Sequence, residues 1–109
     1  MGALDGGDVG GIRIDTSVDG DGAPVVVLVG ELDISNAATL EQTVASITAD
    51  RPRRLIFDLS ELSFMDSAGI AVLIGAASKV QEIALRNPSA VVRRVVELTG
   101  LATVLPIES

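Results

Sequence analysis

The 109-residue sequence contains no cysteine, histidine, tryptophan or tyrosine. Their absence excludes disulfides, zinc sites of the common cysteine or histidine type, and a catalytic triad with a histidine base. The only aromatic residues are Phe57 and Phe64, so the core must be built from aliphatic side chains. Two aromatic rings also offer no platform for stacking the bases of a single-stranded nucleic acid.

Basic side chains are scarce as well. Eight Lys and Arg stand against 15 Asp and Glu, which gives a formal net charge of −7 and argues against nucleic acid as a partner. No apolar run reaches the roughly 18 residues of a membrane-spanning helix, and there is no pattern of a signal peptide. We therefore expect a soluble, cytoplasmic protein that binds neither nucleic acid nor membrane.

The first part of the chain predicts a tail followed by a hairpin. Residues 1–11 hold five glycines and no periodicity, which is typical of a flexible tail. Residues 12–18 alternate between apolar and polar side chains, and Asp19-Gly-Asp-Gly22 has the composition of a turn. The apolar run Val25–Val29 then indicates a buried strand. A single domain is expected over residues 12–109.

The rest of the chain alternates between helical and strand patterns. Strands are expected at 54–59, ending at a polar turn at Ser60-Glu61, at 83–86 and at 104–107. Helices are expected at 37–47 with Ser35 or Asn36 as cap, at 67–80, and from Asn87-Pro88 to Gly100. The order β-β-α-β-α-β-α-β predicts an α/β fold with a mixed, mostly parallel β-sheet and packed helices.

The helix expected at 67–80 has two contrasting faces. At about 100° per residue, the face expected in the core carries Ile70, Leu73, Ile74, Ala77 and Val80. The opposite face carries mostly small residues, namely Ala68, Ala71, Val72, Gly75 and Lys79. Gly69 and Gly75 each cost a helix interior roughly 1 kcal/mol relative to alanine. Close packing inside the domain, or a partner protein outside it, should compensate for that cost.

The candidate chemical groups are Asp33, Asp58, Asp66 and Ser67. The loops after the second and third strands could converge, which would make Asp33 a neighbour of Asp66 and Ser67. Two carboxylates and a hydroxyl could hold magnesium or perform acid–base chemistry; both aspartates equally suit turns and helix ends. A hydroxyl at a helix start lies beside unpaired N–H groups that stabilise an anion. Ser67 is therefore a candidate phosphorylation site.

Four motifs follow one another along the chain: Gly30-Glu-Leu-Asp33, Phe57-Asp-Leu-Ser60, Phe64-Met-Asp-Ser-Ala-Gly69 and Arg93-Arg-Val-Val-Glu-Leu-Thr-Gly-Leu101. Together they resemble the STAS-domain family, and in particular its single-domain members, the bacterial anti-sigma factor antagonists. The resemblance spans about Ile12 to Ile107. In this family the serine after the Asp of the Asp-Ser-(Ser/Ala)-Gly motif is phosphorylated, which implies phosphorylation at Ser67 here.

The resemblance implies a regulatory binding protein and kinase substrate, not an enzyme, that needs no cofactor and no metal. The unphosphorylated form is expected to bind an anti-sigma factor that is also a serine kinase, and so to release a sigma factor. Phosphorylation at Ser67 ends this binding, and a serine phosphatase acting on phospho-Ser67 restores it. The expected partner-binding residues are Asp33, Asp66, Ser67, Ala68, Val72, Gly75 and Lys79.

Two other functions are compatible with the sequence. One is a STAS-type accessory module of a transporter or lipid-trafficking complex, which needs no phosphorylation cycle. The other is a small hydrolase that uses Asp33 and Asp66, although the chain has no phosphate-binding loop and no histidine base. The intact Asp66-Ser67 pair and the single-domain length favour the antagonist.

Overall fold

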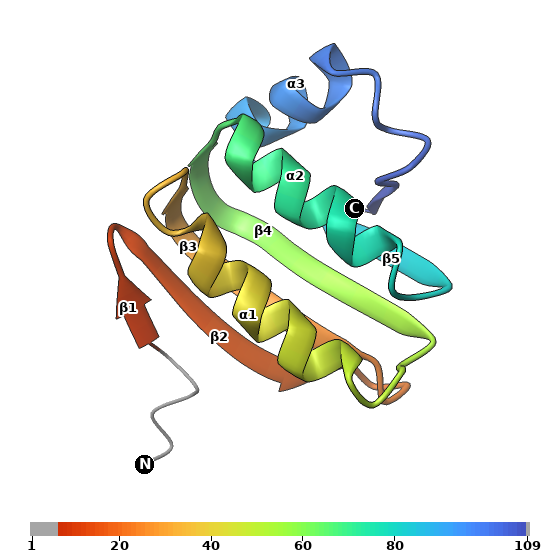
Figure 1. Cartoon of the computed structure of the whole chain (residues 1–109). Helices are drawn as coiled ribbons and strands as arrows, with labels where there is room; N and C mark the ends of the chain where they lie inside the picture. Colours follow the sequence, from red (N-terminus) through yellow and green to blue (C-terminus); the bar gives the residue numbers. More distant parts are fainter. Residues whose placement is uncertain (1–6, 109) are drawn as a thin grey trace.

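Six strands form one sheet in residues 7–108, the part of the chain that the computed structural model describes (Figure 1). The strands are β1 (Gly7–Val9), β2 (Ile12–Val18), β3 (Pro24–Leu32), β4 (Arg54–Met65), β5 (Glu82–Arg86) and β6 (Ile107–Glu108). The helices are α1 (Ala37–Thr48), α2 (Ser67–Ala77) and α3 (Ala90–Leu98). The strands lie in numerical order, antiparallel from β1 to β3 and parallel from β3 to β6. The expected α/β fold with a mixed, mostly parallel sheet is confirmed.

The main core lies between the sheet and the helices and is aliphatic apart from one aromatic ring. Successive residues of a strand point to opposite faces, so alternate positions of β4 reach this core. Phe57 is fully buried there, together with Leu55 and Leu59. α1 and α2 lie side by side over this face (Figure 1), and α1 buries Leu40 and Val44 against it.

β4 is longer than the strand expected at 54–59, and it carries two β-bulges. The first lies between Asp58 and Glu61, and the second lies between Leu62 and Phe64. Each bulge adds one residue to β4 without ending its pairing with β3. The turn expected at Ser60-Glu61 was therefore wrong, because backbone pairing with β3 continues past it.

The bulges decide which side chains of β4 face the core. Each extra residue reverses the alternation of the strand, so the buried position moves from Leu59 to Leu62 and then to Met65. Met65 pairs with Leu32 at the end of β3, and both side chains are buried. β3 and β4 therefore end side by side at one edge of the sheet.

Both outer strands of the sheet differ from the expected ranges. Residues 7–9 form β1, which pairs with β2. The flexible tail expected over 1–11 was therefore wrong for these residues, and residues 1–6 lie outside the described part of the chain. At the other edge, β6 comprises only Ile107 and Glu108 instead of the expected 104–107.

α3 begins later than the Asn87-Pro88 start that the sequence favours. Its N-cap is Ser89, whose Oγ accepts a hydrogen bond from Val92 N at 3.4 Å and donates one to Leu62 O at 2.6 Å. Asn87 has a φ of +50°, a left-handed conformation that belongs to a turn rather than to a helix start. α3 is thereby attached to the bulged part of β4.

The two glycines of α2 occupy different environments. A Cβ on Gly69 would lie 2.7 Å from Met65 Cγ and 2.8 Å from Leu32 Cδ2. Close packing inside the domain therefore accounts for Gly69. A Cβ on Gly75 would meet nothing within 4 Å, and Gly75 is exposed, so the domain itself does not require a glycine there.

Alanine at these two positions should change the free energy of unfolding in opposite directions. Gly69→Ala overpacks a buried site, which typically costs about 1–3 kcal/mol and outweighs the gain in helix propensity. Gly75→Ala enters open space and should gain up to roughly 1 kcal/mol from helix propensity alone. Urea unfolding followed by circular dichroism measures both changes. Equal effects at the two positions would contradict the difference in packing.

An ion-pair network lies on the sheet face opposite the main core. The guanidinium of Arg86 donates to both carboxylate oxygens of Asp19, at 3.3 Å each, and to Glu108 at 3.2 Å. Arg54 donates to Glu108 at 2.6 Å. The network joins the turn between β2 and β3 to β4, β5 and β6. The hydrogen bonds from Arg86 hold the pKa of Asp19 below its usual value, although partial desolvation opposes this.

Asp19→Asn should destabilise the protein at neutral pH and have little effect in acid. A carboxylate with a lowered pKa contributes stability above its unfolded-state pKa, which is 3.8 for Asp19, and loses that contribution as the pH falls through the folded-state value. The denaturation midpoints of wild type and Asp19→Asn should therefore differ at neutral pH and converge in acid, as the pH falls from 3.8 through the lowered folded-state pKa. Asp50→Asn, at an exposed position after α1, is the control. A difference that persists unchanged in acid would rule out the Asp19 ion pair as its source.

Candidate functional site

The carboxyl ends of β3 and β4 bring together the residues singled out in the sequence. Leu32 pairs with Met65, and Asp66 N donates to Leu32 O at 3.2 Å. Asp33 follows β3 directly, and Asp66 and Ser67 follow β4. The expected neighbourhood of these three residues is therefore confirmed.

Asp66 is the N-cap of α2. Its Oδ1 accepts hydrogen bonds from Ala68 N at 2.9 Å and from Gly69 N at 3.2 Å. Ile70 N donates to the Asp66 carbonyl, which begins the helical pattern. The carboxylate thus already occupies two N–H groups that we expected to hold an anion. That expectation is corrected, because a phosphate on Ser67 would have to displace Asp66 to bind them.

Ser67 is the first residue of α2 and is exposed. Within residues 7–108, its hydroxyl has no hydrogen-bond partner. Five other serine hydroxyls instead donate to backbone or carboxylate oxygens, namely those of Ser35, Ser60, Ser63, Ser78 and Ser89. Modification of Ser67 would therefore break no hydrogen bond of the fold.

The other candidate carboxylates also accept local hydrogen bonds, Asp33 in the turn after β3 and Asp58 at the first bulge of β4. Asp33 Oδ1 accepts from Ser35 N at 2.9 Å and from Ser35 Oγ at 2.5 Å. Asp58 makes the same pattern with Ser60, at 3.1 Å and 2.8 Å. Like that of Asp66, both carboxylates accept a hydrogen bond from a nearby backbone N–H group. This favours a structural role for the aspartates over magnesium binding or acid–base chemistry. Among residues 7–108, no group of three or more acidic side chains is arranged to hold a metal ion.

Asn36 organises the site in a way that the sequence did not reveal. It occupies the N-cap position of α1, but its side chain makes no capping bond and is only 1% exposed. Its Nδ2 donates to Gly10 O at 3.0 Å and to Glu31 O at 2.9 Å, and its Oδ1 accepts from Asp33 N at 2.9 Å. Asn36 therefore ties the turn after β1 to the end of β3. One of these partners, Gly10, is 26 residues away in the sequence, and no local pattern indicates that contact.

The surface expected on α2 needs one correction. Val72 is only 8% exposed and belongs to the main core, so its assignment to the outward face was wrong. Ile74, which was expected in the core, is 37% exposed. α2 packs against both α1 and the sheet, so its buried face covers a wide arc. Ala68 is half-buried, whereas Gly75 and Lys79 are exposed as expected.

Comparisons with known proteins agree with this fold. A family model described as the STAS domain matches residues 15–109. The chain belongs to the STAS domain family. It is 33% identical over 89 residues to the anti-sigma-F factor antagonist RsfB of Mycobacterium tuberculosis, covering 79% of this chain and 73% of that protein.

Solved structures show the same STAS fold. An anti-sigma factor antagonist from Mycobacterium paratuberculosis superposes with a TM-score of 0.81 at 32% identity, covering 88% of this chain and 84% of that one. The anti-sigma factor antagonist SpoIIAA in its unphosphorylated form superposes with a TM-score of 0.75 at 24% identity, covering 88% of each chain, which shows the fold alone. Within the described residues of this STAS domain, no helix has the length and apolar character needed to cross a membrane.

Apolar side chains are exposed at the edge of this STAS domain that carries Ser67. Ile34, which follows Asp33, is 82% exposed, and Phe64 at the end of β4 is 43% exposed. Phe64 pairs with Glu31 of β3, so both apolar side chains flank the ends of the two strands. These side chains offer apolar area near Ser67 that a partner protein could bury.

Asp66→Ala should lower the free energy of unfolding by about 1 kcal/mol, because it removes the N-cap of α2. Asp66→Asn should preserve stability, since asparagine caps helices about as well as aspartate. Chemical denaturation of both variants measures the two effects. Equal losses would show that the negative charge, rather than the capping hydrogen bonds, stabilises the helix start.

Proposed function

We propose that this STAS domain is an anti-sigma factor antagonist whose binding is switched off by phosphorylation at Ser67. The partner is an anti-sigma factor that is also a serine kinase, and its capture releases a sigma factor. The observation that carries the proposal is the exposed Ser67 hydroxyl, which has no hydrogen-bond partner among residues 7–108, at the first position of α2. The names of the relatives support this class of partner over a transporter or lipid-trafficking module. In this role the protein is a ligand and a kinase substrate in the cytoplasm, not a catalyst.

The unphosphorylated surface combines apolar and small residues. Ile34 and Phe64 present apolar area next to the aspartates, and Ile74 presents more along α2. The exposed Gly75 leaves open space above the helix, where the backbone of a partner can approach closely. Burial of this area would favour association, and the neutral hydroxyl of Ser67 would oppose it little.

Phosphorylation changes the charge of this surface but not the fold. The Ser67 oxygen attacks the γ-phosphorus of ATP, its proton is released, and ADP leaves. The product carries about 1.5 to 2 additional negative charges. Because Asp66 already holds Ala68 N and Gly69 N, the phosphate lies beside a carboxylate without those amides to neutralise it. Burying such a charge unpaired in an interface costs several kcal/mol. A serine phosphatase reverses the change by hydrolysing the phosphoester.

The switch predicts different outcomes for two substitutions of Ser67. Incubation with the cognate kinase and ATP should add one phosphoryl group to wild type and none to Ser67→Ala, as measured by intact mass. Ser67→Asp should weaken binding to the kinase by at least about tenfold, or about 1.4 kcal/mol. Its melting temperature should stay near that of wild type, because the hydroxyl makes no structural hydrogen bond and the helix start tolerates a negative charge.

Ser46→Asp is the matched control, since it adds the same charge at an exposed position of α1 and should leave kinase binding unchanged. Labelling of Ser67→Ala equal to that of wild type would disprove the assignment of the site. Wild-type affinity of Ser67→Asp would disprove the electrostatic switch. Co-purification with membrane components and no kinase would favour the transporter or lipid-trafficking alternative.

A further inference from the structure

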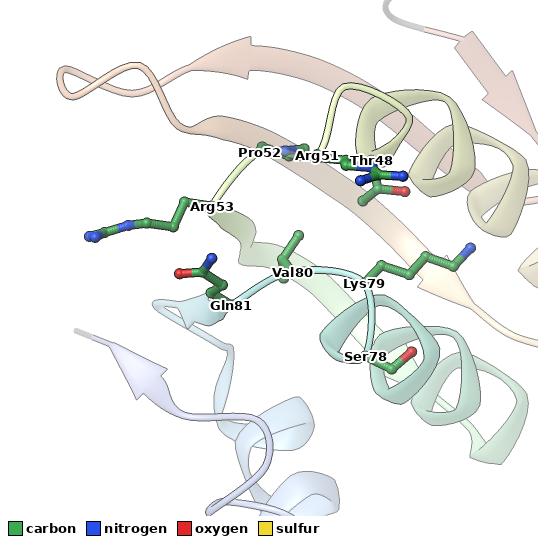
Figure 2. A pocket seen from close by; sticks show the side chains of 8 residues that line it. All are labelled: Thr48, Arg51, Pro52, Arg53, Ser78, Lys79, Val80 and Gln81. Atoms are coloured by element: carbon green, nitrogen blue, oxygen red, sulfur yellow. The ribbon is translucent and has the colours of Figure 1, made fainter.

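A basic hollow of about 610 Å³ lies at the far end of α2 from Ser67 (Figure 2). Its walls are the loops that follow α1 and α2. Arg51 and Arg53 come from the first loop, and Lys79 comes from the second. Three of the eight basic residues of a chain with net charge −7 therefore line one hollow.

Two of these positive charges have no ion-pair partner in the described part of the chain. Arg53 lies 3.6 Å from Glu82, in a pair that is largely exposed. Arg51 and Lys79 are exposed, and no carboxylate within residues 7–108 forms an ion pair with either. Arg54, in contrast, is surrounded by carboxylates. The hollow thus keeps positive charge available for an external ligand.

Hydrogen bonds hold the two loops in fixed positions. The backbone N–H groups of Gln81 and Glu82 both donate to Arg53 O, at 3.1 Å and 3.0 Å. Lys79 N donates to Ala76 O at 3.0 Å, and the half-buried Val80 packs against the main core. A ligand would therefore meet a preorganised backbone, which reduces the entropy lost on binding.

The backbone at Arg51 adopts a conformation that residues with a Cβ rarely take. Arg51 has a φ of +52° just after α1, a conformation in which glycine is favoured over residues with a Cβ. The φ value itself would therefore suit a glycine at this position. The arginine that stands there instead places an exposed guanidinium at the wall of the hollow.

We propose that this hollow binds an extended acidic segment of a partner protein. Figure 2 shows the side chains of Arg53 and Lys79 reaching away from each other, so the cations do not converge on one point. A compact anion such as phosphate would contact one of them at a time. An extended chain with several carboxylates can contact them together. This inference does not depend on the function proposed for Ser67.

The test uses fluorescein-labelled octaglutamate as the probe and the whole 109-residue chain. Fluorescence anisotropy should show binding at low ionic strength that weakens as salt is added. Amide chemical shifts in nuclear magnetic resonance spectra should change at residues 48–53 and 78–81. Absence of binding, or shift changes centred elsewhere, would overturn the proposal. Tripolyphosphate that binds the same residues and displaces the peptide would assign the hollow to compact anions instead.

Single substitutions test whether the probe binds at the hollow or is attracted by positive charge anywhere on the protein. Arg51→Gln and Lys79→Gln should each lower the affinity for the probe roughly threefold. The double variant should lower it about tenfold. Arg94→Gln removes the same charge from an exposed position of α3 and should have no effect. Arg51→Gly should also weaken binding while the melting temperature stays the same or rises, because the left-handed backbone suits glycine. An equal effect of Arg94→Gln, or wild-type binding by the double variant, would overturn the site.

Discussion

The parallel pairing of β3 with β4 is the constraint on which the candidate site depends. It continues through two bulges to Leu32 and Met65, and these two buried side chains are also the ones that a Cβ on Gly69 would strike. The first turn of α2 therefore rests directly on the ends of the two strands. This contact leaves Ser67 on the outside, with Asp33 beside it on the neighbouring loop.

Because Asp66 caps α2, the stability of this helix should depend little on whether Ser67 is phosphorylated. A helix start offers several N–H groups to an anion, but here the Asp66 carboxylate accepts from two of them in the unmodified protein. A phosphate on the neighbouring hydroxyl therefore adds little to the folding of α2, and its charge acts mainly on whatever approaches from outside. An N-cap in this position suits a site that changes its binding without changing its shape.

Local patterns predicted the elements whose signals lie within a few residues, such as the apolar run at Val25–Val29 and the start of α2 at Ser67. These patterns failed where contacts with a segment distant in the sequence determine the local structure. Ser60-Glu61 stays in a strand because pairing with β3 resumes at Glu61 after the first bulge, and Asn36 is held in part by a backbone carbonyl of the turn after β1. The faces of α2 were misassigned at Val72 and Ile74 for another reason. This helix is almost entirely apolar or small, so its periodicity carries little contrast between inside and outside.

The two ends of α2 differ in charge and are separated by the length of the helix. The start of the helix is apolar and acidic, and the hollow beyond its end is basic. An 11-residue helix is about 16 Å long at 1.5 Å per residue. The Debye length is only about 10 Å at 0.1 M salt, so a phosphate on Ser67 is largely screened at Lys79. In the proposed switch, phosphorylation would therefore weaken a contact at the start of α2 and leave an acidic segment bound at the hollow proposed at its end. A partner held at the hollow could then remain attached while its contact with Ser67 is switched.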